Sequence, residues 1–105
     1  MITYADYDTY ESLLSEGFAI VDFYTVTCTP CKMFSKILEE IAGELPFVNI
    51  VKVNLTDYPG IGKKNDISAV PTVFFVKDGQ ILERSEGVMG YDEIMGKVSE
   101  YYYNA

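Results

Sequence analysis

The chain has 105 residues and a formal net charge of −8, with twice as many acidic as basic side chains. A chain of this length and 49% apolar content is typical of one globular domain, so we expect a single domain over residues 1–105. The acidic excess argues against nucleic acid and anionic membranes as partners, because phosphate groups bind clustered lysine and arginine.

The first elements in chain order are a short strand, a helix and a buried strand. Residues 2–4 are β-prone, and a helix is expected at about residues 9–16, with Asp8 as its N-cap and Glu11 as the return partner of a capping box. Residues 18–25 are a continuous apolar run of strand length. Such continuity predicts a central strand that is covered on both faces.

A longer helix is predicted at residues 31–43, where apolar side chains recur at the spacing of one buried helical face. Pro30 suits its first turn, where a missing N–H costs nothing. The other predicted elements are strands at 47–55, 72–77 and 80–86, a hairpin turn at 78–79, and helices at 58–65 and 91–103. This order predicts an α/β fold with helices on both faces of a mixed sheet of four to five strands.

Cys28 and Cys31 are the only cysteines, and they lie between a predicted strand and a predicted helix. A zinc site within one chain would need further ligands, and the chain has no histidine. A structural disulfide is a poor explanation, because so small a loop gains little stability. Two buried, inert thiols are an alternative. The spacing favours redox chemistry: the helix N-terminus should stabilise a Cys28 thiolate that attacks a substrate disulfide, and Cys31 should resolve the mixed disulfide.

Asp22 interrupts the apolar strand six residues before Cys28, and Lys52 is embedded in the next predicted strand. Asp22 is either a water-facing residue at the strand end or a buried carboxylate with a raised pKa that accepts the Cys31 proton. Lys52 is either its partner or a solvated lysine. Pro71 and Gly87 have ordinary explanations too, as a proline at a strand start and a turn glycine.

Several stretches, in order and over nearly the whole chain, resemble the thioredoxin family. They are VDFY at 21–24, C-x-PCKM at 28–33, KVN at 52–54, VPTVFFVKDG at 70–79, and Gly87. The resemblance implies a thioredoxin fold and a dithiol–disulfide reductase, with Cys28 as the exposed nucleophile and Cys31 as the buried resolving cysteine. It also implies recycling by a thioredoxin-reductase-like electron donor, and no bound cofactor besides the redox-active disulfide Cys28–Cys31.

The resemblance extends to the surroundings of the cysteines. Asp22 matches the family's buried acid, and Lys52 matches its lysine partner. Pro71 matches a cis-proline that faces the disulfide. Val70 would then lend its backbone to an extended substrate segment, and Gly87 would let the substrate approach closely.

The chain departs from the family's WCGPC motif. Thr27 replaces a large aromatic residue, and Thr29 replaces a glycine, so that its hydroxyl could donate to the Cys28 thiolate and lower the thiol pKa. Tyr24 stands at another usual tryptophan position, and Lys36 replaces a kink proline. We expect these changes to tune redox potential and partner choice rather than reaction type. The expected substrate-binding residues are Thr27, Thr29, Pro30, Val70, Pro71 and Gly87.

The expected protein is a monomeric, cytoplasmic reductase of disulfides in client proteins. Residues 1–17 carry four acidic and no basic side chains, unlike a signal peptide, and no stretch has the roughly 20 apolar residues of a membrane span. One alternative is a binding module, which would need neither the cysteines nor Asp22 and Pro71. Another is an iron–sulfur carrier, in which two chains each give two thiolates to one [2Fe–2S] cluster.

Overall fold

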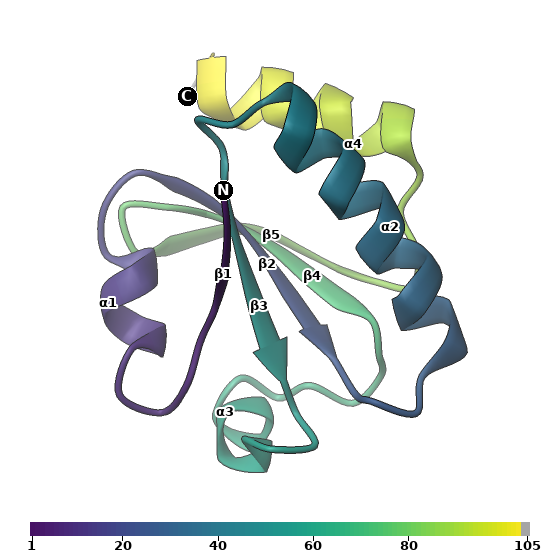
Figure 1. Ribbon diagram of the computed structural model, residues 1–105. Helices are drawn as coiled ribbons and strands as arrows, with labels where there is room; N and C mark the ends of the chain where they lie inside the picture. The colour runs from purple at the N-terminus through teal and green to yellow at the C-terminus, as the bar shows by residue number, and fades with distance from the viewer. Residues whose placement is uncertain (104–105) are drawn as a thin grey trace.

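The computed structural model describes residues 1–103, and a five-stranded sheet lies at its centre (Figure 1). The strand order is β1-β3-β2-β4-β5. The strands are β1 (Ile2–Tyr4), β2 (Phe18–Tyr24), β3 (Asn49–Asn54), β4 (Thr72–Lys77) and β5 (Gln80–Glu86). β1, β3 and β2 are parallel, whereas β4 is antiparallel to both β2 and β5. The predicted mixed sheet is therefore confirmed, with five strands.

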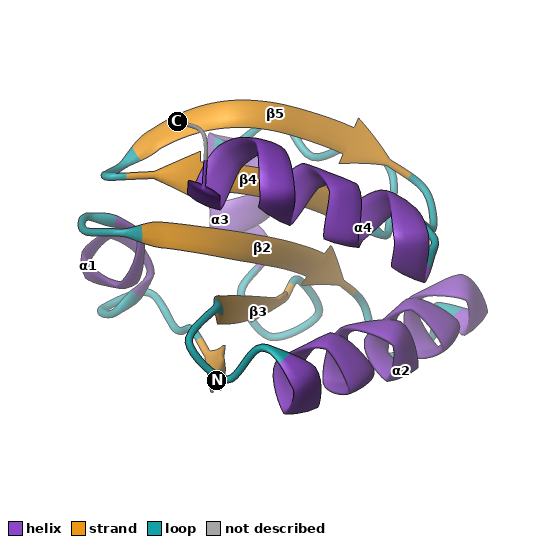
Figure 2. Cartoon of the chain, turned by 90° about the horizontal axis from the view of Figure 1, so that it is seen from above, coloured by secondary structure: helices purple, strands orange, loops and turns teal. Residues whose placement is uncertain are grey.

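Helices cover both faces of this sheet. They are α1 (Tyr10–Leu14), α2 (Thr29–Glu44), α3 (Pro59–Lys64) and α4 (Tyr91–Val98), followed by the π-helical segment η1 (Ser99–Tyr103). Figure 2 shows α2 and α4 together on one side of the strands. None of the helices in the described part of the chain is both long and apolar enough to cross a membrane.

The period-two alternation of β2 divides the core in two. Phe18 and Ile20 pack with side chains of α2 and α4, whereas Val21 and Phe23 pack with side chains of α1 and α3. Every residue of β2 before Tyr24 is buried, as its continuous apolar sequence predicts. Asp22 follows Ile20 at the same parity, so it points toward α2 rather than into water.

The start of α1 differs from the prediction. The helix is shorter than expected, its N-cap is Thr9, and that cap makes no side-chain capping bond. The carboxylate of Asp6, not that of Asp8, accepts the backbone N–H groups of Asp8 and Thr9, both at 2.9 Å. Aspartate side chains commonly accept hydrogen bonds from backbone N–H groups two or three residues later in a turn, and Asp6 does so here. The Asp8–Glu11 capping box is thus wrong, and Glu11 instead pairs with Lys64 at 2.7 Å.

The last predicted helix changes form at its end. Residues 91–98 are α-helical, but Ser99–Tyr103 continue as a π-helix. In that segment the Tyr101 hydroxyl donates to Glu83 of β5 at 2.5 Å, and the Tyr102 ring lies edge-on to Phe18 of β2. The wider turn thus places tyrosine side chains against the sheet.

Candidate active site

Cys28 is the N-cap of α2, and its extended backbone leads from the loop after β2 into the helix. Its Sγ accepts the backbone N–H of Cys31 at 3.1 Å, in the place that a serine or aspartate oxygen usually takes. Because the sulfur caps the helix, α2 begins at Thr29, two residues before the predicted start. Pro30 lies in the first turn, as predicted.

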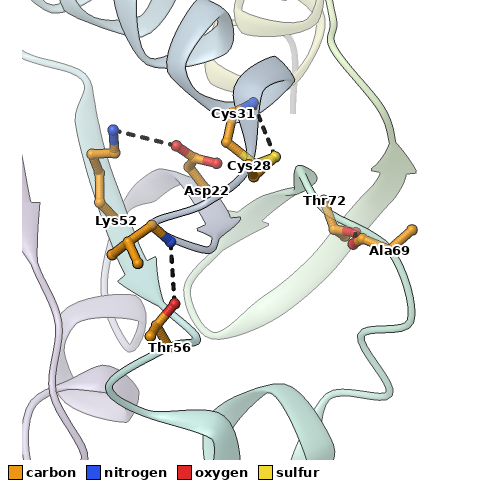
Figure 3. Close-up of a disulfide and its surroundings, with 8 residues drawn as sticks. Asp22, Cys28, Cys31, Lys52, Thr56, Ala69 and Thr72 are labelled. Atoms are coloured by element: carbon orange, nitrogen blue, oxygen red, sulfur yellow. Dashed lines mark hydrogen bonds and ion pairs between the residues drawn. A yellow bond between two sulfur atoms is a disulfide. The ribbon is translucent and has the colours of Figure 1, made fainter.

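Cys28 and Cys31 form a disulfide, with their Cα atoms 5.2 Å apart (Figure 3). The two cysteines are therefore not a pair of inert free thiols. Cys31 is only 3% exposed, whereas Cys28 is partly exposed at the helix end. The N-terminus of the 16-residue helix carries free N–H groups and a partial positive charge, which would stabilise a thiolate on Cys28 after reduction.

Asp22 is fully buried on β2, beside Lys52 on the neighbouring strand β3. Its Oδ2 lies 3.5 Å from the Lys52 Nζ, and neither carboxylate oxygen has a hydrogen-bond partner among the described residues. Burial raises the Asp22 pKa from 3.8 to about 6, and the charge of Lys52 opposes part of that rise. A water-facing Asp22 and a solvated Lys52 are both excluded, since Lys52 is 5% exposed.

The ammonium group of Lys52 contacts two side chains of β2 and one of α2. Besides Asp22 on β2, it donates a hydrogen bond to the Ser35 hydroxyl of α2 and lies 4.9 Å from the centre of the Tyr24 ring. A hollow of about 240 Å³ opens beside this group. Its lining residues are Tyr24, Thr25, Val26, Cys31, Lys32, Ser35 and Lys52. Cys31 and the Lys52 ammonium thus border one cavity.

The second wall of the site precedes β4. The Val70–Pro71 peptide bond is cis, and Pro71 is buried. Its carbonyl accepts the backbone N–H of Gly87 at 2.8 Å. Gly87 has a φ of +91°, and a Cβ there would meet nothing within 4 Å, so its backbone conformation rather than crowding favours glycine.

The topology brings the predicted site residues to one end of the sheet. β4 runs antiparallel to β2 with Thr72 opposite Phe23, so Pro71 lies at the end where β2 leads to the cysteines. Thr72 also pairs with Glu86 of β5, which brings Gly87 to the same end. Thr27, Thr29 and Pro30 are exposed at the start of α2, and Val70 is half-buried.

The structure adds residues that the sequence reasoning missed. The Ser35 hydroxyl accepts a hydrogen bond from Lys52. The Thr72 hydroxyl donates to the Ala69 carbonyl at 2.6 Å, which braces the turn that contains Pro71, and Figure 3 shows Thr72 and Ala69 side by side. The backbone N–H of Val26 donates to the Thr56 hydroxyl at 3.1 Å, which ties the loop before the cysteines to the loop after β3. Ser35 follows Cys31 by four residues, so the helical period already places the two on one face.

Cys28 of the disulfide caps the helix after the central strand, and a buried carboxylate and a cis-proline turn lie at the same end of the sheet. This arrangement defines a dithiol–disulfide protein of the thioredoxin fold. A comparison with protein families matches residues 2–100 to Thioredoxin, and the chain belongs to that family. It is 33% identical to the thioredoxin of Chlamydia muridarum over 101 residues, which cover 96% of this chain and 99% of the relative. The protein is therefore a thiol–disulfide oxidoreductase, and the cysteine pair is its redox centre.

Other relatives carry the same family name. The thioredoxin of Chlamydia trachomatis serovar D is 32% identical over 96% of this chain and 99% of its own length. Thioredoxin Y1, chloroplastic, of Arabidopsis thaliana is 32% identical over 90% of this chain and 56% of its own length. The similarity thus spans bacterial and plant thioredoxins.

Proposed function

We propose that this oxidoreductase reduces disulfides in client proteins. The Cys28 thiolate attacks one client sulfur, which forms a mixed disulfide and releases the other client sulfur as a thiolate. Cys31, after losing its proton, attacks the Cys28 sulfur. That step forms the Cys28–Cys31 disulfide and releases the second client thiol, so two electrons pass from the dithiol to the client.

The unequal surroundings of the two sulfurs are the observation that carries this proposal. Cys28 is partly exposed, caps α2 and accepts an N–H hydrogen bond, all of which favour a reactive thiolate that clients can reach. Cys31 is almost fully buried one turn further, which suits a thiol that stays protonated until the mixed disulfide forms.

Asp22 is the proposed acceptor of the Cys31 proton, directly or through a water. With a pKa of about 6, roughly nine-tenths of its carboxyl groups are ionised at pH 7, and the conjugate acid is still weak enough to hold a proton transiently. Its oxygens have no hydrogen-bond partner among the described residues, so they are free to accept one. Lys52 is proposed to adjust the pKa of this carboxyl group through its positive charge.

The proposed client-binding residues surround the disulfide. The exposed ones at the start of α2 are Thr27, Thr29 and Pro30. Val70 and Pro71 form the facing turn, whose backbone would pair with an extended client segment, and Gly87 borders it. We propose further that residues 1–105 are one domain that works as a cytoplasmic, monomeric electron carrier, recycled by an external reductase.

Alkylation of the reduced protein tests the roles of the cysteines. At pH 7 iodoacetamide should modify Cys28 much faster than Cys31, as followed by mass spectrometry of the native protein. In a cell lysate Cys31→Ser should accumulate covalent mixed disulfides, whereas the matched Cys28→Ser variant should not. Equal alkylation rates, or equal trapping by the two variants, would contradict the assignment.

A further inference from the structure

The buried ammonium of Lys52 donates to a neutral hydroxyl although a carboxylate is within reach. The side chain of Lys52 is 6% exposed, and its Nζ hydrogen bonds to the Ser35 hydroxyl. The Asp22 carboxylate, 3.5 Å away, is its ion-pair partner, but neither carboxylate oxygen lies in hydrogen-bond geometry to a described group. This is unusual, because a carboxylate attracts an ammonium by its full negative charge, whereas a neutral hydroxyl offers only a dipole.

Three elements fix this geometry. Asp22 and Lys52 are directly paired residues of β2 and β3, while Ser35 reaches the ammonium from α2, which packs over that face of the sheet. The Tyr24 ring, 4.9 Å from the Lys52 Nζ, adds a cation–π contact. The ammonium is therefore attracted toward the helix and the aromatic ring as well as toward Asp22.

We propose that Ser35 is a positioning residue: its hydroxyl holds the Lys52 ammonium off direct hydrogen bonding with Asp22 and so keeps that carboxylate free to receive the proton of Cys31. The second half of this inference rests on the proposed function, in which Asp22 is the proton acceptor. The first half concerns only where Lys52 lies.

Among the groups that face Asp22, Lys52 is the charged one that shifts the pKa of its carboxyl group. From α2 comes Cys31, which carries no charge in the disulfide. From β4 comes the apolar Val73, paired with Asp22 in the sheet, and along β2 the phenol of Tyr24 has its own pKa raised by burial, with Asp22 contributing. Burial raises the Asp22 pKa and Lys52 lowers it, so a shift of the ammonium changes the balance.

Removing the Ser35 hydroxyl should let the ammonium close on Asp22. In Ser35→Ala the hydroxyl acceptor on α2 is lost, and the Asp22 carboxylate remains as an acceptor beside the Lys52 ammonium. The direct hydrogen bond that follows favours the ionised carboxylate, so the pKa of Asp22 should fall by roughly one pH unit or more. Ser35→Thr keeps a hydroxyl at the same position and should restore the wild-type value.

The test is a titration of Asp22 by carbon NMR on the full-length oxidised protein with labelled aspartate, assigned by comparison with Asp22→Asn. Ser12→Ala serves as a control, because that serine is exposed on α1 and its hydroxyl donates to the Thr9 carbonyl, far from Asp22 in the sequence. A lower midpoint in Ser35→Ala, with unchanged midpoints in Ser35→Thr and Ser12→Ala, supports the positioning role. An unchanged or higher midpoint in Ser35→Ala, with circular dichroism showing an intact fold, overturns it.

Kinetics separate this inference from the proposed function. The rate at which Cys31 resolves a mixed disulfide between Cys28 and a model thiol is followed against pH in the same variants. If Asp22 is the acceptor, the midpoint of this profile falls in Ser35→Ala together with the NMR midpoint. A lower NMR midpoint with an unchanged rate profile supports the placement of Lys52 by Ser35 and overturns Asp22 as the acceptor.

Discussion

Asp22→Asn should make the folded protein more stable at neutral pH. Asp22 is fully buried and its carboxylate has no hydrogen-bond partner among residues 1–103, so its ionised form is poorly accommodated in the folded state. Asparagine has nearly the shape of the protonated acid and carries no charge. The substitution therefore removes the cost of burying the ionised carboxylate and keeps the packing.

The expected gain follows from the pKa of Asp22, which is raised from 3.8 to about 6 in the folded state. The folded protein then binds this proton more tightly than the unfolded chain, so stability is lost as pH rises from about 4 to about 6. At about 1.4 kcal/mol per pH unit the loss amounts to about 3 kcal/mol. The attraction of Lys52 is already contained in that pKa.

Urea denaturation of the oxidised protein between about pH 4 and 8, followed by circular dichroism because the chain has no tryptophan, measures this gain. The stability of Asp22→Asn should approach that of the wild type near pH 4 and exceed it by up to about 3 kcal/mol at pH 8. The control Asp8→Asn, at an exposed carboxylate, should differ by no more than about 0.5 kcal/mol at any pH. Parallel curves for wild type and Asp22→Asn would refute a raised pKa at Asp22.

Two further substitutions test other parts of the chain. Gly87→Ala should lower the free energy of unfolding by roughly 1–2 kcal/mol, because alanine is strained at a φ of +91° although its Cβ has open space. Gly96→Ala, inside α4 and also in open space, should instead raise the free energy of unfolding by up to about 1 kcal/mol. The same sign for both in urea denaturation would contradict this account. Thr29→Val keeps the side-chain shape without the hydroxyl, so the Cys28 pKa should rise and the protein should become more reducing in a thiol–disulfide buffer. An unchanged ultraviolet thiolate titration would show that this hydroxyl does not stabilise Cys28.

Most of the fold was predictable because the apolar periodicities are strong. The unbroken apolar sequence before Tyr24 predicts a strand buried on both faces, and β2 has that environment. The start of α1 was not predictable from spacing, because Asp6 and Asp8 are both plausible caps. The path of the chain after β1 determines which of the two carboxylates reaches the backbone N–H groups before the helix, and it is that of Asp6.

The candidate site was predictable where an unusual residue type interrupts a pattern. A carboxylate and a lysine within apolar strands and a lone cysteine pair stand out in the sequence, and the structure brings Asp22 and Lys52 together beside α2. Ser35 and Thr72 do not stand out, because serine and threonine are common in helices and strands. Their contacts depend on how α2 meets β3 and how the chain turns before β4, which only tertiary packing determines.

The placement of β2 between β3 and β4 has a consequence for the nascent chain. The cysteines precede β3, but the cis-proline turn at the same end of the sheet leads into β4 and is closed by a hydrogen bond from the Gly87 N–H to the Pro71 carbonyl. During synthesis Cys28 and Cys31 therefore leave the ribosome well before the strand that completes their surroundings. Until residues 72–86 pair, one edge of β2 is open, and the turn that contains Pro71 is not yet in place at that end of the sheet. The end of the sheet that carries the cysteines is thus completed only when the C-terminal hairpin forms.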